Sequence, residues 1–448
     1  MRTRAMRRVT ARYTWDRLRV SFWFAPAIMA LAAILLAWAM YGVDARVPNE
    51  ALESSRFVLS GSVDQLRGIL VTIATTVLAT AGVVFTLLTL PLSTVAAQYG
   101  SRLLRVFLGD RTTQTVLGMF VGTFVYCIVA ATTIESSEVQ PDGPQITATM
   151  GLLLMMTTFG ALILLVQHIS TMLQAPNIAA AAGAELLYIA RVEDPDEAGN
   201  RDDVNRLAQD DRLEIMETEA YLVRVRRNGY IQSLDPEILL TLAQEEDLVI
   251  RLLHKPGDFV WDGVAVAAVW PPVRVDGRLD KQLRRAFRVG NQRTPTQDVE
   301  CAINQLVEMA VRAMSPAIND PFTAMTCLDH IGVGLALFVR QGEENLNTYD
   351  RQGKLRLVFE PVTFDVLLSA AFDMLRHAGC DNAGVLLHML AVIESVGRQT
   401  QSPEARRLLL RHAGLIRTES RAGALIEEDR RRIDLFAEAL DINLGGLE

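Results

Sequence analysis

Four long apolar stretches lie in the N-terminal part of this 448-residue chain, and they restrict its possible folds more than any other feature. They cover residues 21–43, 68–97, 116–134 and 146–169, and none of them contains Asp, Glu, Lys or Arg. A helix needs about 20 apolar residues to cross the hydrocarbon core of a bilayer. The chain is therefore expected to be an α-helical membrane protein with four transmembrane helices and a long polar region after them.

Charged residues between the apolar stretches predict the orientation in the membrane. Seven arginines against the single acid Asp16 precede the first stretch, and three arginines against Asp110 separate the second from the third. The segment after the third stretch carries acids only. Because cytoplasmic loops are enriched in Lys and Arg, both termini are expected in the cytoplasm. The N-terminal arginines act as topology determinants in this interpretation, and contact with anionic lipids is the alternative.

The sequence divides into five segments. These are a basic cytoplasmic N-terminus (1–20), a transmembrane domain (21–174), a helical linker with an acidic loop (175–212), a small β-rich domain (213–272) and a helical cytoplasmic domain (273–448). The cytoplasmic region is thus expected to be α+β. A net charge of -8 argues against nucleic acid as a partner. Four scattered cysteines without a CxxC spacing predict neither a disulfide framework nor a metal site, and no cofactor is expected.

The second apolar stretch has two different faces. At about 100° per residue, its hydroxyl residues fall on one half of the helix, and the opposite half is apolar. Close helix packing is the simpler explanation, because small and hydroxyl residues let transmembrane helices approach. The alternative is the lining of a polar path, which needs several copies of the chain. The candidate positions on this face are Thr72, Thr76, Thr80, Gly82, Thr86 and Ser93, with Pro91 as a predicted bend.

Polar side chains near the inner end of the fourth stretch are limited to Gln167 and His168, which we interpret as membrane-boundary residues. No Asp, Glu, Lys or Arg lies within the four stretches, and this argues against a proton- or sodium-coupled transporter. A histidine at such a boundary is more often an anchor than a ligand, although it titrates near neutral pH.

Short alternating segments predict a β-rich unit after the linker. Residues 221–225 and 230–234 flank Asn228-Gly229 and are expected to pair as a hairpin. Further strands are expected at 248–253, 259–261 and 264–270, with a hairpin turn at Asp262-Gly263. The run from Pro256 to Val260 is similar to the turn signature of biotinyl and lipoyl carrier domains. No lysine stands at an exposed hairpin tip, so the similarity implies a sandwich-like shape without carrier function.

Helical periodicity returns in the last third of the chain. Helices are expected from Asp298 onward and at residues 363–377, 383–396, 403–418 and 421–440. Between the first two lies a distinctive string, residues 313–324, in which Ser315-Pro316 and Asp320-Pro321 each pair a capping side chain with a proline. A tight joint between two helices is the favoured interpretation. The alternative is a small polar site for a cation or phosphate, built from Asp298, Ser315, Asn319, Asp320, Asp329 and His330.

These features together resemble a family of bacterial predicted integral membrane proteins, domain of unknown function 2254. The resemblance rests on the four-span layout, on Gln167-His168-Ile169, on Gln297-Asp298 and above all on Ser315-Pro316 through Ala324. This chain has Glu308 where the family usually has aspartate, and Gln167 where it often has a second histidine. The resemblance implies a location in the bacterial inner membrane and no established activity.

Three functional classes are compatible with the sequence. The first is a homo-oligomeric channel or uncoupled pore in the lipid bilayer, gated by the cytoplasmic region. The second is a membrane-anchored binding, signalling or scaffold module. The third is an enzyme with a site near Asn319-Asp320, which is disfavoured because no GxSxG, Walker, Rossmann, HExxH or kinase motif occurs. Four spans exceed what an anchor requires, so a pore is the preferred hypothesis.

Overall fold

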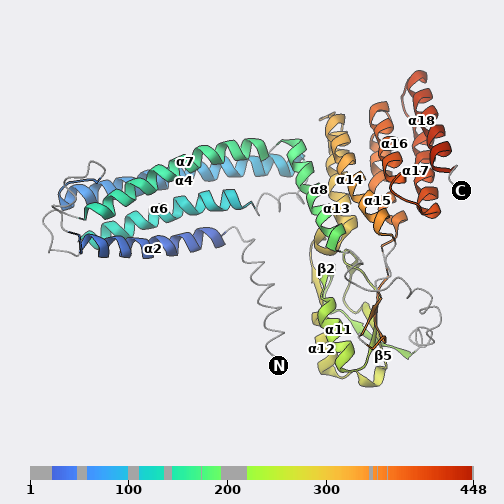
Figure 1. Ribbon diagram of the computed structural model, residues 1–448, viewed down its shortest axis with the longest axis horizontal. Helices are drawn as coiled ribbons and strands as arrows, with labels where there is room; N and C mark the ends of the chain where they lie inside the picture. Colours follow the sequence, from blue (N-terminus) through green and yellow to red (C-terminus); the bar gives the residue numbers. More distant parts are fainter. Residues whose placement is uncertain are drawn as a thin grey trace. The chain divides into compact units, whose positions relative to one another are not determined.

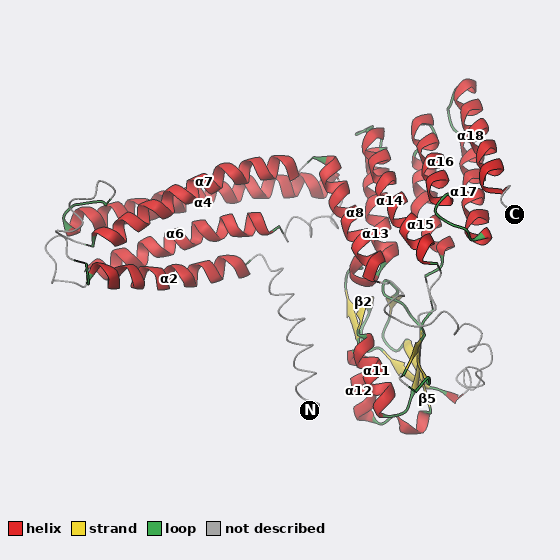
Figure 2. Cartoon of the chain, viewed as in Figure 1, coloured by secondary structure: helices red, strands yellow, loops and turns green. Residues whose placement is uncertain are grey.

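A computed structural model describes residues 23–47, 58–98, 110–135, 144–172, 174–192, 219–342, 347–350, 352–360 and 362–445. The chain forms two compact units, Met1–Asn177 and Ile178–Glu448 (Figure 1). Within the described residues the first unit is helical, and strands occur in the second unit (Figure 2). The predicted basic segment 1–20 and the acidic loop from residue 193 to 212 lie outside the described residues.

The first unit contains four long helices, α2 (Phe24–Asp44), α4 (Val63–Gln98), α6 (Arg111–Glu135) and α7 (Gln145–Met172). Each coincides with one of the four apolar stretches, because a helix satisfies every backbone polar group within one segment. Helices α6 and α7 each contact the other three helices. Gly118 of α6 allows α2 to approach, since a Cβ at this position would overlap Sδ of Met29. Small residues thus set the spacing in this bundle.

The composition of the described helices allows more membrane spans than the four apolar stretches. Five helices of the described residues are long and apolar enough to cross a membrane, and the fifth is α14 (Pro321–Gln341) in the second unit. Helix α14 packs against α13 (Val299–Ala313) and α16 (Ala383–Gly397). The structure therefore supports several apolar helices, while the count of four spans stays a prediction.

The second unit contains a series of further helices. They are α8 (Ala175–Val192), α13, α14, α15 (Phe364–Ala378), α16, α17 (Pro403–Ala422) and α18 (Glu427–Gly445). Several begin at side-chain caps: Thr363, Asn382 and Ser402 each accept a hydrogen bond from the N–H group three residues ahead. Polar caps and an apolar period near 3.6 explain why α15 and α16 lie close to the predicted positions. Helix α17 continues past the predicted end to Ala422, and α18 begins at Glu427 instead of residue 421.

The strands of the second unit form two sheets. The larger has the order β1-β5-β3-β8-β7 and the smaller the order β4-β2-β6. The strands are β1 (Tyr221–Arg224), β2 (Gly229–Leu234), β3 (Val249–Leu252), β4 (Phe259–Val260), β5 (Ala265–Trp270), β6 (Phe287–Gly290), β7 (Thr348–Tyr349) and β8 (Leu355–Val358). Buried side chains of both sheets share one core with α11 (Pro236–Glu245) and α12 (Gly277–Arg285). The sandwich-like shape stays a prediction.

Strand pairing differs from the expectation at both predicted hairpins. Strand β1 pairs with β5, and β2 pairs with β4 and β6, so the predicted hairpin at Asn228-Gly229 is wrong. The turn at Asp262-Gly263 connects β4 and β5, which also lie in different sheets. Turn residues specify a reversal of the chain, whereas the packing of the two sheets determines which strands pair. No strand is expected beyond Trp270, yet β6, β7 and β8 follow, and β8 joins β3 in parallel.

Candidate functional site

Helix α4 has one face inside its bundle and one face outside. The inner face is apolar and buried, with Leu70, Ala74 and Val77 each fully covered. On the outer face Thr72, Thr76 and Thr86 are exposed and Thr80 is half-buried, and the apolar Val83 and Leu87 are exposed between them. A Cβ at Gly82 would meet no atom within 4 Å. The hydroxyl face therefore does not pack against the other helices of its own unit in the described residues. Pro91 and Ser93 lie in α4, but their side chains are outside the described part.

The four threonine hydroxyl groups described on this face bond to their own helix. Thr72 Oγ1 donates to the carbonyl of Gly68 at 2.7 Å, Thr76 Oγ1 to Thr72 at 2.8 Å and Thr80 Oγ1 to Thr76 at 2.8 Å. Thr86 Oγ1 likewise donates to Gly82 at 3.1 Å. Because each proton is used, the oxygen lone pairs point outward as weak acceptors without charge. Such a surface tolerates contact with a second helix and also offers oxygen ligands to a hydrated ion.

Inside the bundle, polar groups hold α2, α6 and α7 together. The carboxylate of Asp44, at the end of α2, accepts hydrogen bonds from the backbone N–H groups of Ile146 (2.9 Å) and Thr147 (2.8 Å). Asp44 thus caps the N-terminus of α7 from another helix. Tyr126 Oη donates to the Thr147 carbonyl at 2.9 Å. The sequence contains one signal for this contact, an acid directly after an apolar stretch, but it does not identify the partner.

His168 is paired at the opposite end of the same helix. Its Nε2 lies 3.1 Å from Oδ2 of Asp110, the residue before α6, whereas Gln167 is exposed. Burial of Asp110 disfavours its charge, but hydrogen bonds from Thr113 and the neighbouring imidazole outweigh burial and lower the pKa of Asp110. The contact ties α7 to the start of α6. It gives His168 an anchoring role in this bundle.

Four of the candidate polar residues of the second unit, Asp298, Ser315, Asn319 and Asp320, lie at or beside helix ends. Asp298 caps α13 by accepting from Cys301 N at 2.9 Å, and it also accepts from Arg293 Nε at 2.6 Å. Asp320 caps α14 by accepting from Thr323 N at 3.1 Å. Ser315 lies in a turn, where its carbonyl accepts from Asn319 N at 2.8 Å. Both aspartates therefore have partners that account for their positions.

These residues are not brought together around one point. Asp298 and Asn319 flank opposite ends of α13, whose 15 residues span about 22 Å at the usual helical rise. Asp329 instead pairs with His388 of α16 at 2.7 Å. His330 faces α8, where a Cβ at Gly183 would lie 2.6 Å from its Nδ1. Of the set, Ser315, Asn319 and Asp320 are neighbours at the joint. No group of three or more possible metal ligands occurs among the described residues.

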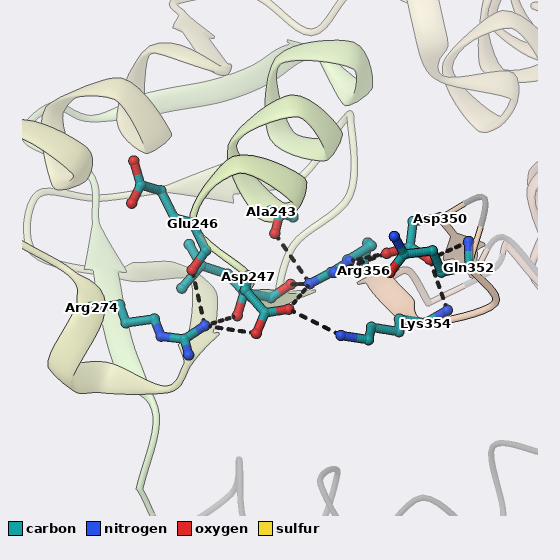
Figure 3. A network of polar contacts seen from close by, with 9 residues as sticks. Ala243, Glu246, Asp247, Arg274, Asp350, Gln352, Lys354 and Arg356 are labelled. Atoms are coloured by element: carbon teal, nitrogen blue, oxygen red, sulfur yellow. Dashed lines mark hydrogen bonds and ion pairs between the residues drawn. The ribbon is translucent and has the colours of Figure 1, made fainter.

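A separate polar network holds β8 in the larger sheet (Figure 3). Arg356, buried in β8, contacts Asp247 at 2.8 Å and Asp350 at 2.8 Å and donates to the carbonyl of Ala243 at 3.3 Å. Hydrogen bonds from Arg274 and Arg356 lower the pKa of Asp247 to about 2. The polar groups of Arg356 bond to other residues of this network, which indicates a structural role. Its residues are far apart in sequence and carry no motif, so the sequence gives no sign of it.

An apolar helical bundle and an attached α+β unit define the class of the protein, a membrane protein with a large polar region. The chain belongs to the family described as predicted membrane protein, domain of unknown function 2254, whose model matches residues 19–395. This confirms the family resemblance of the sequence. Membership establishes a membrane protein and assigns no chemical activity.

Similar proteins occur in mycobacteria. The chain is 25% identical to the uncharacterized proteins Mb1321c of Mycobacterium bovis and Rv1290c of Mycobacterium tuberculosis, over 386 residues in each case. The matched region covers 84% of this chain and 72% of each relative. No solved structure matches the chain.

Proposed function

We propose that the protein crosses the bacterial inner membrane four times, with both termini in the cytoplasm, and self-associates through the outer face of α4. Several copies then arrange their hydroxyl faces around a polar path for ions or small solutes. The second unit acts as a cytoplasmic vestibule or gate in this proposal.

The outward direction of the hydroxyl face is the observation that carries the proposal. Packing within the bundle is ensured by the opposite, apolar face of α4, so the exposed threonines are not explained by contacts inside one copy. A second copy of the same face provides the close contact that small and hydroxyl residues favour. Back-bonded hydroxyls also give a neutral path with low affinity for the permeating species, which conduction requires.

The contacts of α14 support four spans. Its Ala324, Leu328 and Leu335 are fully buried. The same helix carries Asp329, which is paired with His388 on α16. A buried apolar side and a charged outer side are typical of a core helix in a water-soluble fold rather than of a lipid-facing span.

Ion flux through liposomes containing the purified full-length protein tests this proposal. The variant Thr76→Phe places a ring on the hydroxyl face of every copy, and we expect the flux to fall by about tenfold through steric block and dewetting. The matched control is Thr157→Phe on α7, an exposed threonine that also bonds to its own helix, at 3.1 Å to the Leu153 carbonyl.

The control is expected to leave the flux and the oligomer size unchanged. Absence of flux with the natural protein contradicts the pore and favours a membrane-anchored module. An equal loss of flux in both variants contradicts the assignment of the path to α4.

A further inference from the structure

The joint between α13 and α14, residues 314–320, exposes apolar side chains on a rigid turn. Ile318 is 45% exposed and Phe322, in the first turn of α14, is 78% exposed. Pro316 and Ala317 are exposed beside them. Asn319 adopts a φ of 49°, and Asp320 N donates to the Ala313 carbonyl at 2.8 Å, so the turn is fixed by its backbone. We call these four side chains the joint patch: Pro316, Ala317, Ile318 and Phe322. All four are exposed to solvent in the described structure.

Helix α8 shows which end of the second unit the joint patch occupies. Gly183 of α8 lies against His330 of α14, and Leu186 lies against Gly334. Further along, Gln341 Nε2 donates to the Ala190 carbonyl at 3.2 Å. Residue numbers rise together on both helices, so α8 and α14 run parallel. Ala175 and Phe322 each lie eight residues, or about 12 Å, before the contact of Gly183 with His330. The first turns of α8 and α14 are therefore level with each other.

The start of α8 is covalently close to the membrane. Helix α7 ends at Met172 and α8 begins at Ala175, so two residues separate an apolar span from the first turn of α8. The first turn of α14, which is level with that of α8, therefore lies at the end of the helical part that follows α7 after two residues. The joint patch projects from this end.

We propose that the joint patch is a lipid-contact site that inserts Ile318 and Phe322 into the interfacial region of the bilayer. Apolar side chains on a rigid protrusion gain free energy when they leave water for the acyl boundary. The partner is the surface of the lipid bilayer, since the patch projects from the end of the unit where the chain leaves the membrane. This role explains why the most distinctive string of the polar region combines prolines and caps with uncovered apolar residues. It does not depend on a pore.

A dye attached at single cysteines in the full-length protein tests the proposal. Cys380 is first replaced by serine, because Cys127, Cys301 and Cys327 are buried. An environment-sensitive fluorophore is then placed at Ile318→Cys or Phe322→Cys, and the protein is reconstituted in liposomes with or without lipids that carry a nitroxide quencher. The control is Val273→Cys, an apolar residue of the β-rich part that is 95% exposed. All positions are exposed, so the substitutions leave the core intact.

The proposal predicts blue-shifted emission at residues 318 and 322 and quenching by nitroxide lipids, with water-like, unquenched emission at residue 273. Water-like emission at 318 and 322 would overturn it. Blue-shifted emission without quenching by lipid also overturns it, because the patch is then covered by protein, such as a second copy of the chain. Neither result depends on whether the liposomes conduct ions.

Discussion

At the scale of single residues, Arg356 shows how one buried charge connects distant segments. Its guanidinium is 7% exposed and lies between Asp247 and Asp350, whose own side chain is 9% exposed. Arg356→Ala leaves the Asp350 carboxylate without the guanidinium that it contacts, and we expect a loss of about 2–3 kcal/mol in the free energy of unfolding of the second unit. Thermal denaturation of the protein in detergent measures this. Lys354→Ala is the control: its Nζ is exposed, 3.8 Å from Asp247, and the expected loss is below about 0.5 kcal/mol.

The pH dependence of Asp247 follows from the same network. Hydrogen bonds from Arg274 and Arg356 depress its pKa to about 2 in the folded protein, below the value of about 4 for an unfolded chain. A depressed carboxyl pKa stabilises the folded state above pH 4, and this contribution is lost as the pH falls from about 4 to 2.

We therefore predict that the natural protein melts above Asp247→Asn at neutral pH and that the difference shrinks toward pH 2. Asparagine accepts the φ of 49° at this position, so the backbone is retained. Melting curves of both proteins between pH 7 and pH 2 provide the comparison. A difference that is independent of pH contradicts the role of the charge.

At the scale of elements, substitutions of Asp320 at the start of α14 distinguish a helix cap from a ligand site. Asp320, the last residue of the joint, accepts from Thr323 N. Asp320→Ala is expected to lower stability by about 1 kcal/mol, whereas Asp320→Asn retains most of the cap. Calorimetry with phosphate and divalent cations accompanies the melting curves. Binding that is present in the natural protein and lost in Asp320→Asn contradicts the cap interpretation.

Helices were predictable from the sequence because their signals are local. The apolar period and the caps at Thr363, Asn382 and Ser402 act within a few residues. Strand pairing depends on distant segments, so Asn228-Gly229 correctly signals a turn but not the partners of β1 and β2. Strand β8 joins β3 after more than 90 intervening residues, through a ladder from Ile250 to Leu357. No short-range pattern specifies that contact.

The features of the candidate residues also divide into those that follow from the local sequence and those that depend on contacts between distant segments. The two faces of α4 follow from its sequence, because the angle between residues is fixed at about 100°. Which face turns outward depends on α6 and α7, and close packing of Thr76 and Thr80 within one copy is not found in the described structure. The pairing of His168 with Asp110 and of Asp44 with α7 joins residues from different helices. Contacts of this kind require the tertiary structure.

At the scale of the whole molecule, the side of the membrane on which the C-terminus lies distinguishes a protein with four spans from one with five. If α14 is a core helix of the second unit, the C-terminus returns to the side of the N-terminus, and basic residues 1–20 place both in the cytoplasm. A fluorescent protein that matures only in the cytoplasm, fused after Glu448, is expected to be bright, and an alkaline phosphatase fusion at the same site inactive. The opposite pair of results favours an odd number of spans, including α14.

Contact between outer faces of α4 in neighbouring copies is the central claim, and cysteine cross-linking in native membranes tests it most directly. Single cysteines at Thr72, Thr76 and Thr86 are exposed on the outer face, and cysteines at Thr132 on α6 and Thr157 on α7 serve as controls on exposed faces of other helices. Oxidation or a short bifunctional thiol reagent joins cysteines whose Cα atoms approach within about 7 Å or slightly more. We predict covalent dimers at the three α4 positions and monomers at the controls. Monomers at all α4 positions, or dimers at the control positions alone, contradict the account.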